Sequence, residues 1–166
     1  ISGGWAAKEL TEKGLKTLVL ERGRDVRHVL DYPTMTKEPW ELPHADKLPA
    51  EEMKFYPVQS RTNWVTQANK HWWVKDNENP YTEVKPFDWI RGYHAGGRSI
   101  TWGRQTYRLS DLDFEANLKD GVGVDWPIRY ADLSPWYDYV ETFIGVSGQA
   151  EGLPQLPDGK FLPAMD

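Results

Sequence analysis

The sequence contains no cysteine among its 166 residues. Disulfide bonds, thiolate nucleophiles, cysteine-ligated zinc and iron–sulfur clusters are therefore excluded within this chain. No apolar run approaches the roughly 18 residues that a membrane-spanning helix needs, so we expect no membrane span. Basic residues are in the minority, with 20 Lys and Arg against 25 Asp and Glu. Because phosphate backbones require a basic surface, nucleic acid is not an expected partner.

The composition is that of a loop-rich globular protein. Hydrophobic residues make up 39% and charged residues 27% of the chain, with 14 Gly and 12 Pro. The length is sufficient for one domain with a real core. The first residues resemble the inside of a motif, and the Pro-rich segment 152–163 gives the domain no obvious finish. We therefore expect a fragment of a longer protein, with both ends cut.

The first 23 residues have the pattern of half a βαβ unit. Gly3 and Gly4 precede a run of helix formers that closes at Gly14, and the apolar segment 17–20 has the composition of a buried parallel strand. Glu21 follows that strand. In dinucleotide-binding folds, glycines at a helix N-terminus let backbone N–H groups hold a pyrophosphate, and an acid about 20 residues later binds the ribose. The alternative is an ordinary helix–strand unit with a surface glutamate.

Residues 25–85 contain several prolines, and their apolar residues do not repeat with the period of a helix or a strand. The segment is rich in large rings, which we expect to anchor loops onto a core rather than to stack on sugar faces: Trp40, Tyr56, Trp64, Trp72, Trp73 and Tyr81. Its histidines lack the spacing of metal ligands, so we expect them to be solvated or hydrogen-bonded: His28, His44 and His71.

Residues 91–104 form the most informative segment. The Gly96-Gly97 doublet allows a ligand to approach the backbone closely, and Arg98 adds a positive charge beside it. The hydroxyls of Ser99 and Thr101 are suited to contact a diphosphate or the edge of a flavin ring. Further along, Ser134 and Pro135 predict the start of a helix that Gly145 closes. Its apolar residues repeat at three and four and predict a core-facing stripe: Leu133, Trp136, Tyr137, Val140, Phe143 and Ile144.

Taken together, three blocks of the chain resemble the glucose–methanol–choline (GMC) family of FAD-dependent oxidoreductases. The first runs from Ile1 to Gly23 and is similar to the family's amino-terminal flavin-adenine dinucleotide motif without its opening G-x-G. The second, from Arg91-Gly92 to Tyr107-Arg108, is similar to its arginine–glycine and double-glycine loop. The third, Asp125-Trp126-Pro127-Ile128 to Gly148, resembles the bacterial sugar and gluconate dehydrogenase and pyranose oxidase branch.

The resemblance implies an α/β fold containing part of a Rossmann-like FAD-binding domain. Its βαβ unit lacks the first strand, and an irregular Pro- and Trp-rich excursion and a C-terminal helix accompany it. Residues 1–30 and 86–130 are expected to be discontinuous and incomplete parts of the FAD-binding domain. Residues 31–85 are then an insertion covering the cofactor, and residues 131–166 a helix with the start of the substrate-domain region.

The resemblance also assigns roles to residues. Gly3 and Gly4 are expected at the pyrophosphate, Glu21 is expected at the adenosine ribose, and Arg22 is expected to bind the cofactor. A further set is expected along the path from the diphosphate to the flavin: Gly96, Gly97, Arg98, Ser99, Thr101, Trp102 and Gly103. Some members bind the flavin covalently through a histidine two residues after the serine of this loop. Thr101 occupies that position and cannot form the link, so the resemblance implies non-covalent FAD.

The implied activity is oxidation of an alcohol on a sugar or polyol by hydride transfer to flavin N5, with oxygen, a quinone or a cytochrome as the electron acceptor. The family's catalytic base is a histidine in a region expected beyond Asp166. We predict no catalytic residue in this chain, and His94, beside the double glycine, is not expected to be the base. Two alternatives remain open: an NAD(P)-dependent dehydrogenase and a non-catalytic, aromatic-rich carbohydrate-binding module, which would be rich in β-structure.

Overall fold

The computed structural model describes residues 1–62 and 64–163, which form two compact units, 1–102 and 103–166. The predicted boundaries at residues 30, 85 and 130 divide the chain by expected function, not by compactness. They stay a prediction. Within the described residues, no helix has the length and apolar character needed to cross a bilayer.

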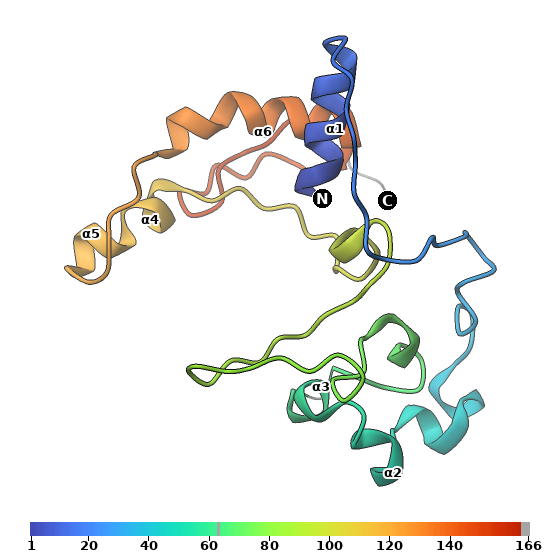
Figure 1. Ribbon diagram of the computed structural model, residues 1–166. Coiled ribbons are helices and arrows are strands. Elements are labelled where there is room, and N and C mark those ends of the chain that lie inside the picture. Colours follow the sequence, from blue (N-terminus) through green and yellow to red (C-terminus); the bar gives the residue numbers. More distant parts are fainter. Residues whose placement is uncertain (63, 164–166) are drawn as a thin grey trace. The chain divides into compact units, whose positions relative to one another are not determined.

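The first unit begins with a helix and continues through short helical turns (Figure 1). Helix α1 spans Ser2–Glu12, and Gly14 follows it with a φ of 79°, which confirms the predicted helix and its glycine terminator. The remaining elements are 3₁₀ turns and helices of at most five residues: η1 Pro39–Glu41, η2 Pro43–Asp46, α2 Ala50–Met53, α3 Pro57–Arg61, η3 Lys70–Trp72 and η4 Gly97–Ile100.

The strand predicted over residues 17–20 does not form. The segment has no regular hydrogen bonding, and Leu18 and Leu20 are 82% and 87% exposed. A strand needs a neighbour to pair with, and the described residues provide none for this segment. The expectation of a buried parallel strand is therefore wrong for this chain, although an apolar extended segment is present.

A small core organises the proline-rich excursion. Leu48, Tyr56, Val65 and Trp73 are buried together, with Phe55, Trp72 and Ile90 packed against them. The predicted anchoring role is confirmed for Tyr56 and Trp73, but Trp40 and Trp64 are exposed. The region is thus irregular, as expected, yet it has its own hydrophobic centre.

The second unit contains α4 Asp111–Phe114, α5 Ala116–Asp120, α6 Tyr130–Ile144, β1 Val146–Ser147 and β2 Phe161–Leu162. The two strands pair in parallel, with Val146 opposite Phe161. Figure 1 shows α6 as its longest helix. The described chain is therefore mixed and helix-rich, which is compatible with an α/β class, while the Rossmann-like unit stays a prediction. It is not the β-rich chain of the carbohydrate-binding alternative.

Helix α6 begins five residues earlier than predicted, with Arg129 and not Ser134 at the cap position. The Asp132 carboxylate accepts a hydrogen bond from Arg129 N at 2.8 Å, and Asp111 Oδ1 accepts one from Tyr130 N at 2.7 Å. These carboxylates satisfy free N–H groups at the helix start, so Ser134 is not the cap and Pro135 lies inside the helix. Gly145 closes the helix with a φ of 73°, as predicted.

The predicted apolar stripe on α6 is only partly correct. The side chains of Trp136, Phe143 and Ile144 are exposed, whereas the buried side chain of the helix is that of Glu141. Glu141 accepts two hydrogen bonds from the guanidinium of Arg108, at 2.8 and 2.5 Å, and one from Lys160 N at 2.7 Å. A buried ion pair therefore lies where the sequence pattern predicted apolar packing.

Candidate functional site

The proposed pyrophosphate glycines lie in the first turn of α1 rather than in the loop before it. Ser2, Gly3 and Gly4 are its first three residues, and no side chain caps it. The N–H groups of a first helical turn have no acceptor within the helix. A Cβ added at Gly3 or Gly4 would meet no heavy atom within 4 Å, so the space beside this backbone is open.

The end of the first block lies against the beginning of the glycine loop. Arg24 N donates to Tyr93 O at 3.3 Å, and Ala95 N donates to Arg24 O at 2.8 Å, which makes a parallel bridge between Arg24 and His94. A Cβ on Gly23 would lie 2.4 Å from His94 N. Two motifs separated by about 70 positions therefore meet through their backbones, and only glycine fits at residue 23.

Glu21 and Arg22 already have partners within the chain. Glu21 Oε1 accepts a hydrogen bond from Gly23 N at 2.6 Å, which uses one of its two carboxylate oxygens. The Arg22 guanidinium lies over the Tyr93 ring at 3.9 Å and donates to Asn79 Oδ1 at 3.5 Å. The structure thus brings both residues to the start of the glycine loop, where Arg22 stacks on the ring of Tyr93.

The double glycine adopts backbone conformations that favour glycine. Gly96 and Gly97 have φ angles of 91° and 55°, which disfavour other residues, and a Cβ on Gly97 would meet nothing within 4 Å. Ser99 Oγ donates to Gly96 O at 2.5 Å, which closes the turn. Arg98 Nη2 donates to Ile90 O at 2.7 Å, so this side chain holds the loop instead of extending from it.

The last three predicted residues differ in their surroundings. Thr101 Oγ1 is buried and has no hydrogen-bond partner among the described residues, which leaves it available to an absent polar group. Trp102 is about two-fifths exposed. Gly103 begins the second unit, where a Cβ would meet only the flexible side chain of Gln105, and it is not placed relative to the others.

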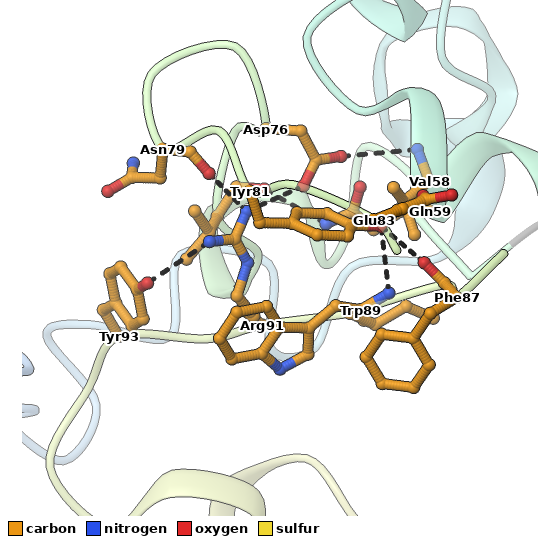
Figure 2. Close-up of polar contacts among 12 residues, drawn as sticks. Val58, Gln59, Asp76, Asn79, Tyr81, Glu83, Phe87, Trp89, Arg91 and Tyr93 are labelled. Carbon is orange, nitrogen blue, oxygen red and sulfur yellow. Dashed lines mark hydrogen bonds and ion pairs between the residues drawn. The ribbon is translucent and has the colours of Figure 1, made fainter. Parts of the chain in front are cut away.

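A buried arginine, Arg91, lies at the start of the loop segment, and its buried ion pair was not expected from the sequence. Arg91 is 6% exposed, and its Nη2 pairs with Asp76 Oδ1 at 3.3 Å and donates to Asn79 O at 2.5 Å. Figure 2 shows its guanidinium among the rings of Tyr81 and Trp89, whose centroids lie 5.2 and 4.8 Å away. The Arg91-Gly92 dipeptide belongs to the second block, whereas nothing in the sequence singles out Asp76.

Two histidines also have unexpected environments. His94 is 5% exposed, and neither of its ring nitrogens has a hydrogen-bond partner among the described residues. The same holds for His71 Nε2, so the expectation of a solvated or hydrogen-bonded His71 is wrong for that atom. Burial lowers the pKa of both histidines, and the charge of Arg24 lowers it further. The described chain holds no group of three acidic or histidine side chains placed to bind a metal.

The chain is similar to several curated oxidoreductases. It is 25% identical over 165 residues to the 2-methyl-1,2-propanediol dehydrogenase of Mycolicibacterium austroafricanum, a match covering 94% of this chain and 24% of that protein. Identity to the gluconate 2-dehydrogenase flavoprotein of Pantoea cypripedii is 27% over 165 residues, with 89% and 25% covered. The fructose dehydrogenase large subunit of Gluconobacter japonicus is 28% identical over 158 residues, with 89% and 26% covered.

No protein-family profile and no solved structure matches the chain. The chain spans about a quarter of the length of these curated relatives. At this level of identity, the matches show a similarity to oxidoreductases and support no finer assignment.

Proposed function

We propose that this chain carries the FAD-binding part of a GMC-type oxidoreductase that oxidises an alcohol group of a sugar or polyol. The observation that supports it most is the bridge between Arg24 and His94. This bridge joins the end of the first block, which carries Glu21, to the double-glycine loop. The resemblance assigns both segments to one nucleotide. The names of the relatives include a flavoprotein and dehydrogenases of a diol, a sugar acid and a sugar.

The residues present fit a flavin nucleotide. The first turn of α1 offers free N–H groups for a diphosphate, and the backbone at Gly97 is open to close approach. Glu21 keeps one carboxylate oxygen for ribose hydroxyls, and Thr101 Oγ1 is a buried hydroxyl without a described partner. When bound, FAD supplies the acceptor for hydride at N5.

The chain's own contribution is binding and orientation. Arg91 and Arg98 hold the loop by their hydrogen bonds to Asn79 O and Ile90 O, which fixes the backbone before a ligand arrives. We assign no general base to a residue of this chain. Thr101 offers no nitrogen for a covalent flavin, so the cofactor is non-covalent in this proposal.

The test is the visible absorption spectrum of the full-length protein, repeated on supernatant and pellet after acid precipitation. We expect flavin bands that move to the supernatant. Colour that stays in the pellet would contradict non-covalent binding, and a protein that remains colourless after incubation with FAD would contradict the proposal itself. Alcohol oxidation is then tested with sugars and polyols and an artificial electron acceptor.

A matched pair of variants tests the nucleotide assignment. Glu21→Ala removes charge-assisted hydrogen bonds of about 1.5–3 kcal/mol, so FAD affinity is expected to fall about tenfold to a hundredfold. Glu12→Ala removes a carboxylate at the other end of α1 and is the control. Equal FAD dissociation constants for the two variants, measured by fluorescence titration, would remove Glu21 from the site.

A further inference from the structure

A polar pocket lies in the first unit, and residues 96–102 are not among the residues that line it. It has a volume of about 320 Å³, within the range of about 300–1,000 Å³ typical of small-molecule sites. Its lining combines aromatic rings with polar groups, including Arg24, His71, Trp72, Asn79, Tyr93 and His94. The bridge between Arg24 and His94 forms part of its wall, so the fold itself builds the pocket.

The unsatisfied atoms of this pocket are concentrated on its two histidines. Both nitrogens of His94 and Nε2 of His71 are buried without a partner among the described residues. Trp72 lies between the rings, with centroids 4.5 Å from His71 and 5.3 Å from His94. A neutral imidazole has one donor and one acceptor, and leaving such atoms unpaired in a buried place is costly. The pattern indicates a partner that both gives and takes a hydrogen bond.

The charges around the pocket favour a neutral partner. Its three cationic side chains are each paired: Arg24 with Asp31 at 3.1 Å, Lys70 with Glu52 at 2.6 Å and Lys75 with Glu78 at 3.3 Å. The three cations that line the pocket are therefore already compensated by carboxylates. Metal ions are also disfavoured, because the described residues contain no ligand cluster. Hydroxyl groups are neutral and act as donor and acceptor at once.

We propose that this pocket binds neighbouring hydroxyl groups of a neutral ligand, with His94 and His71 as hydrogen-bond partners and Trp72 against the apolar face. Two sources carry this chemistry: a free saccharide or polyol, and the ribose of a bound nucleotide. The proposal concerns binding alone, so it stands whether or not the protein oxidises alcohols.

The experiment uses the full-length protein with myo-inositol as the probe and cyclohexanol, which has the same ring size and one hydroxyl, as the control ligand. Calorimetry gives the dissociation constants, and ¹⁵N signals of the histidine rings report new hydrogen bonds. We expect inositol, and not cyclohexanol, to bind and to shift the signals assigned to His94 and His71. Each of His94→Leu and His71→Leu is expected to weaken binding about threefold to tenfold.

Two further variants, together with His71→Leu, separate a role in binding from a role in folding. His94→Gln restores a donor and an acceptor and should recover part of the affinity, which a merely structural role does not predict. His71→Leu tests the pocket independently if His94→Leu fails to fold. His44→Asn is the matched control, because His44 is exposed and asparagine tolerates its φ of 55°.

Titrations with and without saturating FAD distinguish the two sources. Inositol binding to the FAD-loaded protein identifies a free polyol as the ligand. Binding to the FAD-free protein alone, together with a similar loss of FAD affinity in His94→Leu, identifies the ribose. The proposal is overturned if inositol and cyclohexanol behave alike and both leucine variants keep the FAD affinity of His44→Asn.

Discussion

At the scale of single residues, the least replaceable position is Gly23. A Cβ there would lie 2.4–2.6 Å from three backbone atoms of His94, and backbone cannot move aside as a flexible side chain does. We expect Gly23→Ala to destabilise the first unit by about 1–3 kcal/mol, the usual cost of overpacking. Gly4→Ala is the control, because its Cβ would lie in open space on a helix and should not destabilise. Equal urea midpoints for both variants would contradict the bridge.

The same scale shows what residue patterns can and cannot predict. The double glycine could be singled out from the sequence, and the structure shows that both Gly96 and Gly97 have positive φ angles, which glycine adopts at least cost. It did not predict that Arg91 would pair with Asp76, or that His94 would be buried without a partner. Those facts depend on contacts between segments at least 15 positions apart, which no local pattern encodes.

The buried histidines predict a dependence of stability on pH. Burial lowers the pKa of His71 and His94 below the ordinary value of about 6.5, so between the two values the unfolded chain binds more protons. Stability is therefore fully present above about pH 6.5 and falls as the pH drops through the folded-state pKa. Glu52, whose pKa Lys70 lowers from 4.5, loses its contribution only at more acidic pH.

Urea midpoints between about pH 7.5 and 5 test this dependence, because carboxylates with ordinary pKa values of about 4 titrate mostly below that pH range. We expect the midpoint of the parent protein to fall across it and that of the His71→Leu/His94→Leu double variant to fall less. The exposed His44→Asn variant should follow the parent. Parallel profiles for all three proteins would show that the buried histidines do not set the dependence.

At the scale of elements, helices were predicted better than the strand. A helix satisfies its hydrogen bonds internally, so α1 and α6 could be expected from local composition, although carboxylates from Asp111 and Asp132 moved the start of α6. A strand needs a partner, and residues 17–20 have none in the described chain. The short turns of the excursion depend on the core around Tyr56, which periodicity does not reveal.

Helix α6 is fixed to its unit by a charged cluster. The Arg108 side chain is 3% exposed, and its guanidinium also contacts Asp138 Oδ1 at 2.6 Å and Tyr130 Oη at 2.9 Å. Hydrogen bonding to Glu141 is the largest cause that raises the pKa of Arg108, so its charge is permanent. Replacing Glu141 therefore leaves a buried cation with fewer partners.

A double-mutant cycle measures this cluster. Glu141→Leu is expected to destabilise the protein by about 3 kcal/mol, the lower part of the range for breaking a buried pair, because Asp138 remains. Arg108→Met/Glu141→Leu should recover a large part of that loss, since it removes both charges. Chemical unfolding of the four proteins gives the coupling energy. Additive effects would mean that the two side chains act independently.

At the scale of the whole molecule, the apolar segment 17–20 is exposed in this chain. Leu18 and Leu20 share one face of an extended segment and are almost fully exposed, which is unusual for a stable surface. The curated relatives are about four times as long as the region they share with this chain. In the proposed FAD-binding domain, the segment pairs as a buried strand within the full-length protein.

Replacing Leu18 and Leu20 by lysine should then be favourable in the 166-residue chain and unfavourable in the full-length protein. In the 166-residue chain, Leu18→Lys/Leu20→Lys adds charge to an exposed apolar edge, so we expect less self-association by light scattering. In the full-length protein, the lysines would enter a buried sheet, and we expect a loss of several kcal/mol in unfolding experiments. Lys16→Leu is the control for charge in the same segment. An equal effect in both contexts would mean that residues 17–20 remain exposed in the longer protein, which would remove the strand from the proposed domain while leaving the helix and the glycine loop untouched.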